Sequence, residues 1–412
     1  MKTFEEKKKQ YAQLLIKFGL NLQKGQNLIL NAPIEAHDFV LLLAEVAYEA
    51  GAREIFYRRQ SERLEALKYQ KAPEEVFGSY PQWLADGYTE EVQKNCAVLA
   101  LRMDDPKVLE KADPRLLEKE VKARATAFKR YKDFVAGNGT NWLIASIPTA
   151  GWANAIYGTE NTEENMQKLR NQIFSLVRLD SEDAFQAWGT HLQNLKSYAD
   201  FLNSKSFKKL YYRSEKTDLT VVLPEGHRRI SAGEKTKSGI PFCPNMPTEE
   251  VFSMPHKYGV DGILASTLPL HYQGKLISNF SLTFKAGEVV DFSAEEGYEV
   301  LKSLLEADPW SKRLGEVAIV PVSSPISQSG LVFFNTLFDE NASCHFALWS
   351  AYPTNLLGAE TMSAEEKDKV WMNESMMHVD FMVGDKSLTI IGETESWEKI
   401  PFFVNGEWNI LP

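Results

Sequence analysis

The sequence predicts an α/β N-terminal domain with a mainly parallel sheet, followed by an α+β C-terminal domain rich in antiparallel sheet. A strand–helix–strand pattern within about 30 residues near the N-terminus is typical of a parallel crossover unit. Beyond residue 202 the pattern changes to short alternating or β-branched runs. A chain of 412 residues is also long enough for two domains. We expect domains at 1–195 and 196–412, with the boundary between residues 185 and 208.

The N-terminal elements follow from the spacing of apolar residues. Apolar positions at helical spacing predict helices over 4–18, 34–50, 115–134 and 163–202. Short apolar runs predict buried strands at 27–30, 54–57, 98–101 and 142–145. Gly51 is expected to end the second helix. Because strands and helices alternate, we expect a parallel sheet.

The C-terminal half is expected to contain much antiparallel sheet. Apolar or alternating runs predict strands at 210–212, 219–223, 276–284, 317–322, 377–383, 388–391 and 402–404. Turn residues are frequent between these runs, which favours antiparallel pairing. One clear helix is expected among the strands, at 294–306.

Composition excludes several classes of protein. Hydrophobic residues make up 44% and charged residues 25%, which is ordinary for a globular protein. The formal net charge of −10 speaks against a nucleic-acid-binding surface. The three distant cysteines, Cys96, Cys243 and Cys344, form no disulfide framework and fit a reducing compartment. The N-terminus is charged from the start, and no apolar run is long enough to span a membrane, so we expect a cytoplasmic protein.

Nucleotide and serine-hydrolase motifs are absent from the sequence. There is no glycine-rich phosphate-binding loop and no G-x-S-x-G motif. The search for chemistry therefore turns to His, Asp and Glu. Five of the seven histidines lie in the predicted C-terminal domain, and two of them, His345 and His378, have acidic residues close by.

His378 and Asp380 lie in the strand-like run 376–383. Because side chains alternate along a strand, both point to one face, while Val379 and Phe381 take the other. An imidazole and a carboxylate side by side are suitable ligands for a divalent cation. The alternative is a half-buried strand with a polar, solvated face.

A second segment contains Glu340 and His345, which would flank a turn that enters a helix or a strand. The alternative interpretation is a polar loop with a structural histidine. Cys344 has no C-x-x-C partner, and we interpret it as a packing residue. Tyr352 follows shortly after His345 in the sequence.

Two more acidic segments precede these. Glu249 and Glu250 come just before an apolar pair, with His256 close by. Thr248 could equally be the N-cap of a helix whose first turn carries the two acids. Glu316 stands just before an apolar strand, which by itself indicates little.

Taken together and in order, these segments resemble the aminopeptidase T family, which includes aminopeptidases S and PepS. The resemblance spans nearly the whole chain, and the PepS branch is the most similar. It rests on Met-Pro-Thr-Glu-Glu-Val-Phe at 246–252 with Pro255 and His256, Gly-Glu-Val-Ala at 315–318, Phe-Asp-Glu-Asn at 338–341 with Cys344 and His345, and His-Val-Asp-Phe-Met at 378–382.

The resemblance implies a metallo-aminopeptidase that removes N-terminal residues from short peptides with a free N-terminus. Two divalent ions per chain are implied, Zn²⁺ or Co²⁺, with Mn²⁺ or Mg²⁺ also suited to the site. Glu316 would bridge the two ions and, with Tyr352, take part in catalysis. Glu249 and His256 would support the ligands. The implied ligands are Glu250, Glu316, Glu340, His345, His378 and Asp380.

These residue types suit the implied chemistry. Four carboxylates bring two dications close to neutrality once a bridging hydroxide is counted, and a tyrosine hydroxyl can stabilise an oxyanion. The resemblance also implies a homodimer that encloses its sites, with the N-terminal domain controlling access. Two alternatives stay open: another dinuclear metal-dependent amidohydrolase or phosphatase, and a non-catalytic, two-lobed peptide-binding protein that needs no metal.

Overall fold

The computed structural model describes residues 2–102, 105–272, 274–375 and 377–410. The chain divides into two compact units, the first made of Met1–His191 and Gly233–Pro247 and the second of Leu192–Ala232 and Thr248–Pro412. The segment Gly233–Pro247 thus returns to the N-terminal unit after the chain has entered the other one. The expected division into domains 1–195 and 196–412 stays a prediction.

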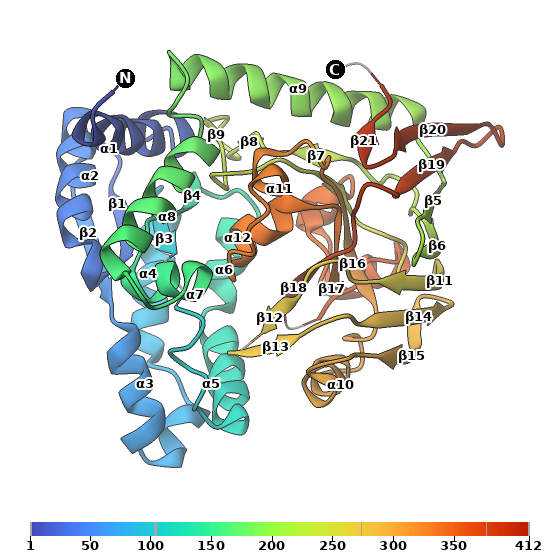
Figure 1. Cartoon of the computed structure of the whole chain (residues 1–412), viewed down its shortest axis with the longest axis horizontal. Helices are drawn as coiled ribbons and strands as arrows, with labels where there is room; N and C mark the ends of the chain where they lie inside the picture. Colours follow the sequence, from blue (N-terminus) through green and yellow to red (C-terminus); the bar gives the residue numbers. More distant parts are fainter. Residues whose placement is uncertain (1, 103–104, 273, 376, 411–412) are drawn as a thin grey trace. The chain divides into compact units, whose positions relative to one another are not determined.

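The first unit is built on a four-stranded parallel sheet of order β2-β1-β3-β4 (Figure 1). This confirms the predicted α/β class with a parallel sheet. Each strand contains the apolar run that predicted it. The strands are β1 (Leu28–Pro33), β2 (Ile55–Gln60), β3 (Ala97–Arg102) and β4 (Trp142–Ser146).

Helices surround this sheet. A buried cluster around Ile29, Val92 and Val98 joins β1 and β3 to α4, with Tyr131 and Phe134 of α6 packed against it. The helices are α1 (Phe4–Gln13), which continues as a π-helical turn over Leu14–Gly19, α2 (His37–Glu49), α3 (Glu62–Lys71), α4 (Gln82–Gln93), α5 (Pro114–Ala127), α6 (Lys129–Ala136), α7 (Ala150–Tyr157) and α8 (Thr162–Leu176), followed by α9 (Ala184–Lys205), which runs from the first unit into the second.

Two helix predictions need correction, and three helices were missed. The expected helical segment 163–202 is interrupted between α8 and α9, at 177–183. The expected helix 115–134 is two helices, α5 and α6, which meet at Phe128. Helix α3 was not predicted because it buries no residue, so it has no apolar stripe facing a core: Leu64 and Leu67 are 67% and 49% exposed. Helices α4 and α7 were also missed.

The second unit contains two large sheets, as predicted rich in antiparallel pairs (Figure 1). The five-stranded sheet has the order β18-β17-β16-β10-β7, and the eight-stranded sheet the order β15-β14-β11-β6-β5-β19-β20-β21. The strands are β5 (Lys209–Arg213), β6 (Asp218–Val222), β7 (Ile230–Ser231), β10 (Val251–Ser253), β11 (Val260–Ala265), β14 (Ser281–Lys285), β15 (Glu288–Ser293), β16 (Leu314–Ile319), β17 (His345–Trp349), β18 (His378–Met382), β19 (Thr389–Glu393), β20 (Lys399–Val404) and β21 (Glu407–Trp408).

Aromatic side chains fill the space between these two sheets. The ring of Tyr212 on β5 lies 4.9 Å from that of Phe346 on β17, measured between centroids. Phe280, which precedes β14, packs at 5.5 Å against Phe381 of β18. The inner face of the five-stranded sheet is therefore apolar and buried, which leaves its other face for polar groups.

The remaining elements correct two predictions. The expected strand 276–284 is two strands separated around Asn279, whose φ of 46° lies in the left-handed region and interrupts an extended chain. Besides α10 (Tyr298–Leu305), the one helix that was predicted among these strands, there are further short helices. These elements are α11 (Pro325–Ser329), α12 (Thr336–Asp339), α13 (Ala364–Lys369), and the small pairs β8 (Glu234–Lys235) with β9 (Pro241–Phe242) and β12 (Leu270–Tyr272) with β13 (Lys275–Ile277).

Among the helices of the described residues, none has both the length and the apolar character required to cross a lipid bilayer.

Candidate metal centre

Alternation along three neighbouring strands places polar ligands on one face and apolar residues on the other. In β18, His378 and Asp380 share a face, as predicted, and β17 pairs with it so that Ala347 lies opposite Asp380. In β16, Glu316 pairs with the same Ala347. Paired residues point to the same side of a sheet. The small Ala347 therefore stands between Glu316 and Asp380 and leaves space above the sheet for their carboxylates.

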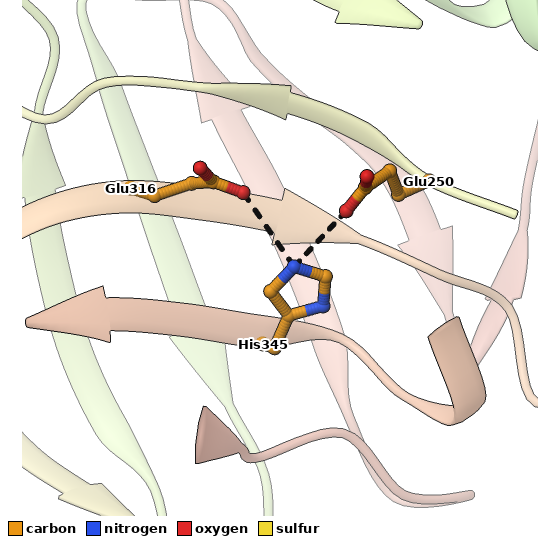
Figure 2. Close-up of side chains that lie close together, drawn as sticks. All are labelled: Glu250, Glu316 and His345. Carbon is orange, nitrogen blue, oxygen red and sulfur yellow. Dashed lines mark ion pairs between the residues drawn. The ribbon is translucent and has the colours of Figure 1, made fainter. Parts of the chain in front are cut away.

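His345 and Glu250 complete one group with Glu316. His345 Nε2 lies 3.1 Å from Glu250 Oε2 and 3.5 Å from Glu316 Oε1. Figure 2 shows the imidazole between the two carboxylates, with Glu316 on β16, His345 on β17 and Glu250 just ahead of β10. One donor atom from each of the three residues lies within 4.8 Å of the others. All three residues are buried, with exposed fractions of 7% or less.

The second group consists of Glu316, His378 and Asp380. His378 Nε2 lies 3.3 Å from Glu316 Oε2 and 3.1 Å from Asp380 Oδ1. The donor atoms of these three residues again lie within 4.8 Å of one another. Glu316 belongs to both groups and directs a different oxygen toward each histidine. A single carboxylate thus connects two adjacent sets of donor atoms.

Both histidines are oriented by the backbone. His345 Nδ1 lies 3.1 Å from the carbonyl oxygen of Ser343, and His378 Nδ1 lies 2.7 Å from that of Ser350. Because a carbonyl only accepts, each Nδ1 carries the proton and donates. This arrangement directs Nε2 toward the carboxylates, as in histidines that bind metals in proteins.

The local electrostatics reflect an excess of buried acid. Burial lowers the pKa of His345, but its hydrogen bonds with Glu250 and Glu316 outweigh this and raise the pKa well above the ordinary value. Burial also lowers the pKa of His378, while electrostatic interactions with Tyr352 and Asp380 raise it well above normal. Burial raises the pKa of Glu250. The cluster therefore takes up protons unless another cation is bound.

Glu340 lies near this cluster but belongs to neither group of three. Burial, followed by the charges of Asp380 and Glu250, raises the pKa of Glu340 well above the ordinary value. Asn341 connects the turn containing Glu340 to the segment before β10: its side-chain oxygen accepts from the backbone N–H of Glu249 at 2.7 Å. The Asn341 amide donates to Leu337 O at 3.0 Å and to Glu340 Oε1 at 3.4 Å.

Tyr352 lies beside the second group. Its ring centroid is 4.7 Å from that of His378, and Phe252 of β10 packs against it at 6.2 Å. The charge of His378 lowers the pKa of Tyr352, but desolvation and the carboxylate of Glu316 raise it by more, so the pKa lies above its ordinary value. The phenol therefore keeps its proton at neutral pH and can donate a hydrogen bond.

Gly315 permits the position of Glu316. The pairing of β16 with β17 shifts register between Leu314 and Glu316, as in a β-bulge. A Cβ atom on Gly315 would collide with the backbone carbonyl of Ser350. The bulge thus requires glycine, and it positions the shared carboxylate within the strand rather than just before it, where the sequence suggested.

Of the predicted supporting residues, Glu249 is buried beside the site and His256 is not in contact with either group. The contacts described for His256 are with Tyr258, whose N–H donates to its Nδ1, and with the stacked ring of Trp371 at 5.1 Å. The segment 248–250 leads into β10 rather than a helix, so the helix-cap interpretation of Thr248 is wrong. The supporting roles of Glu249 and His256 stay predictions.

A divalent cation suits this arrangement of donors. Asp380 Oδ1 is buried and accepts no hydrogen bond from any described residue, although His378 Nε2 lies 3.1 Å away. Buried carboxylate oxygens normally have a partner, and a metal ion supplies one. Mixed imidazole and carboxylate ligands are those of Zn²⁺, Co²⁺ and Mn²⁺. A buried site of this type on rigid strands is typical of a metal-dependent hydrolase.

Comparisons with known proteins agree with that class. The family model for thermophilic metalloprotease (M29) matches residues 4–408. Aminopeptidase 2 of Geobacillus stearothermophilus is 43% identical over 408 residues, covering 99% of both chains. The wild-type AmpT structure from Thermus thermophilus aligns with a TM-score of 0.93 at 38% identity, covering 99% of this chain and 100% of that one.

The chain therefore belongs to the thermophilic metalloprotease (M29) family, which confirms the resemblance found in the sequence. Aminopeptidase PepS of Streptococcus thermophilus is 36% identical over 409 residues, covering 99% of both chains. This identity is lower than that to Aminopeptidase 2, so it does not support the closer resemblance to the PepS branch.

Proposed function

We propose that the chain is a metallo-aminopeptidase that removes N-terminal residues from short peptides. Two divalent ions would be held on the polar face of the five-stranded sheet, opposite its apolar inner face; we call this polar face the outer face. The observation that carries this proposal is Glu316, whose two oxygens lie 3.5 and 3.3 Å from the Nε2 atoms of His345 and His378. A carboxylate that connects two donor groups is suited to bridge two cations. Membership of the metalloprotease family and the names of its relatives support the peptide-bond chemistry.

The two ions would divide the ligands between them. Glu250 and His345 would hold one, His378 and Asp380 the other, and Glu316 would bridge them. Glu340 is proposed as the sixth ligand because it is coupled electrostatically to Asp380 and Glu250. Zn²⁺ or Co²⁺ are the proposed ions, with Mn²⁺ or Mg²⁺ as alternatives.

When bound, such ions lower the pKa of a water molecule and polarise the scissile carbonyl group. The protein's own residues determine what is bound and where. The four carboxylates of the proposed ligand set would balance the charge of two dications, so they hold the ions without leaving the loaded site strongly charged. The hydroxyl of Tyr352, which keeps its proton, is placed to donate a hydrogen bond to the oxyanion that develops during amide hydrolysis.

The test is a comparison of substrates with the purified protein. We expect it to cleave amino-acid p-nitroanilides, to lose this activity with EDTA, and to regain it with Zn²⁺ or Co²⁺. Cleavage of p-nitrophenyl phosphate alone would favour the phosphatase alternative. Peptide binding by calorimetry without any turnover, in protein loaded with metal, would favour the binding-protein alternative.

We also propose that the protein is a cytoplasmic homodimer in which the first unit takes part in association. Helix α3 supports this because it buries no residue within the chain, and Leu64, Leu67 and Trp83 are 67%, 49% and 75% exposed. Exposed apolar surface of this kind is typical of an interaction site. All three cysteines are buried and free, which fits a reducing compartment. Sedimentation of wild type and Leu67→Glu tests the association, and cell fractionation tests the location.

A further inference from the structure

Arg229 brings a guanidinium group to the inner face of the five-stranded sheet. It directly precedes β7, in which Ile230 pairs with Phe252 of β10 and Ser231 with Val251. Phe252 lies on the same face as Glu250, two residues earlier. Arg229, one residue before Ile230, therefore takes the opposite, apolar face. Its 4% exposure agrees with a position between the two sheets.

This guanidinium has no partner among the described residues. Nη1 and Nη2 are both buried and make no hydrogen bond, and no carboxylate pairs with the group within the described part of the chain. Burial lowers the pKa of Arg229 to about 10, which still leaves it charged at neutral pH. A charge that is buried without a counter-charge destabilises the folded state.

Among the described residues, the titratable groups His227 and Tyr212 interact electrostatically with Arg229, and neither provides a negative charge. Burial, followed by the charge of Arg229, lowers the pKa of His227 to about 4, so this side chain is neutral at pH 7. Tyr212 on β5 is fully buried, and its hydroxyl also has no hydrogen-bond partner among the described residues. Burial raises the pKa of Tyr212, and the charge of Arg229 offsets this only in part. The hydroxyl therefore keeps its proton and adds a third unused donor.

The backbone of Arg229 is held firmly, so the group cannot easily turn outward. Its N–H donates to Asn203 Oδ1 at 2.7 Å, and Asn203 Nδ2 donates to its carbonyl oxygen at 3.0 Å. Tyr212 is held by its ring contact with Phe346. The backbone of Arg229 and the ring of Tyr212 are thus held in place.

We propose that Arg229 and Tyr212 form a buried binding site for a small monovalent anion of the halide class, between the two sheets of the second unit. A guanidinium cannot accept a hydrogen bond, so the ligand must be an acceptor. A water molecule would satisfy the donors but would leave the positive charge uncompensated, whereas a halide satisfies both. The anion would anchor edge strand β7 and, through its pairing, β10, directly after Glu250.

The experiment compares thermal unfolding of the metal-loaded, full-length protein in sodium chloride, sodium bromide and sodium gluconate at equal ionic strength. A ligand that binds only the folded state raises Tm with its concentration. We expect chloride and bromide to raise Tm by a few degrees relative to gluconate. Arg229→Met should remove this difference, while Arg130→Met, the same change at an exposed site, should retain it.

Two further measurements cover the case in which Arg229→Met does not fold. Tyr212→Phe removes only the third donor and should raise the halide concentration needed for half the Tm shift. Crystals of the wild type grown in bromide should show an anomalous peak beside the Arg229 guanidinium. Equal Tm in all three salts, or ordered water without an anomalous signal at that position, would overturn the proposal.

Discussion

The two faces of the five-stranded sheet carry buried charge of opposite sign. The outer face gathers Glu250, Glu316 and Asp380 around two histidines, so negative charge exceeds positive charge. The inner face is apolar, filled by residues such as Phe346 and Phe381, and also carries Arg229, whose guanidinium has no partner among the described residues. Strand alternation alone produces this separation, because neighbouring residues point to opposite faces. One strand can therefore serve a metal site and a packed core at the same time.

The largest effect is expected from removing the carboxylate shared by the two outer-face groups. Glu316→Gln should lose both ions and reduce kcat/KM by about 10³-fold or more, because each ion contributes several kcal/mol of transition-state stabilisation. His378→Ala alters only the second group and should leave about one ion per chain while also abolishing activity. Metal content by mass spectrometry and p-nitroanilide hydrolysis measure both effects.

The control is Glu299→Gln, the same change at an exposed position on α10, which should retain both ions and full activity. Equal metal content in Glu316→Gln and the wild type would contradict this prediction, because the shared carboxylate would then not be needed to hold the ions.

Tyr352→Phe should have the next largest effect. It removes a hydrogen-bond donor without touching a ligand, so metal content should be unchanged while kcat falls about 10²–10³-fold. KM should change little. Steady-state kinetics on the metal-loaded variant measure this, and full turnover by Tyr352→Phe would show that the phenol only packs against His378.

The acid excess of the outer face also predicts a pH dependence of metal binding. In the metal-free protein the pKa values of His345 and His378 lie well above normal, so both hold protons at neutral pH that a metal must displace. Affinity should therefore rise with pH and weaken on acidification, by about tenfold per pH unit for each proton released.

Calorimetric titration with Zn²⁺ in two buffers of different ionisation enthalpy measures the number of protons released. Identical binding enthalpies in both buffers, together with a constant affinity, would contradict this prediction.

The smallest effect on activity is expected from the inner face. Val317 lies between Glu316 and Ala318 but points into the apolar layer, where it is fully buried. Val317→Ala should lower the free energy of unfolding by about 1–3 kcal/mol through lost burial and a small cavity. Chemical denaturation measures the loss. Metal content and kcat per folded molecule should stay at wild-type values, and a loss of metal would show that the two faces are not independent.

Much of the site could be predicted because the relevant patterns are local. The alternation in 376–383 was enough to place His378 and Asp380 on one face, and their donor atoms lie 3.1 Å apart. The buried strands of the first unit followed in the same way from apolar runs. Helix α3 and the break at Asn279 were missed because an exposed helix has no apolar stripe and one residue in a left-handed conformation leaves no periodic signal.

Other parts of the site could not be predicted from any local pattern. Asn341 reaches the backbone of Glu249, 92 residues away in the chain, and the backbone carbonyls of Ser343 and Ser350 have no side-chain signature. The bulge at Gly315 depends on the approach of another strand.

By itself the sequence determined which residue types could bind a cation, which of them share a strand face, and which family the chain resembles, because side-chain chemistry and strand period are local properties. The distances that join Glu316 to both histidines, and the burial of Arg229 without a partner among the described residues, could be known only from the tertiary structure. These features depend on the order in which distant strands pair. Pairing order is set by the packing of the whole unit, so it is not encoded in any one segment.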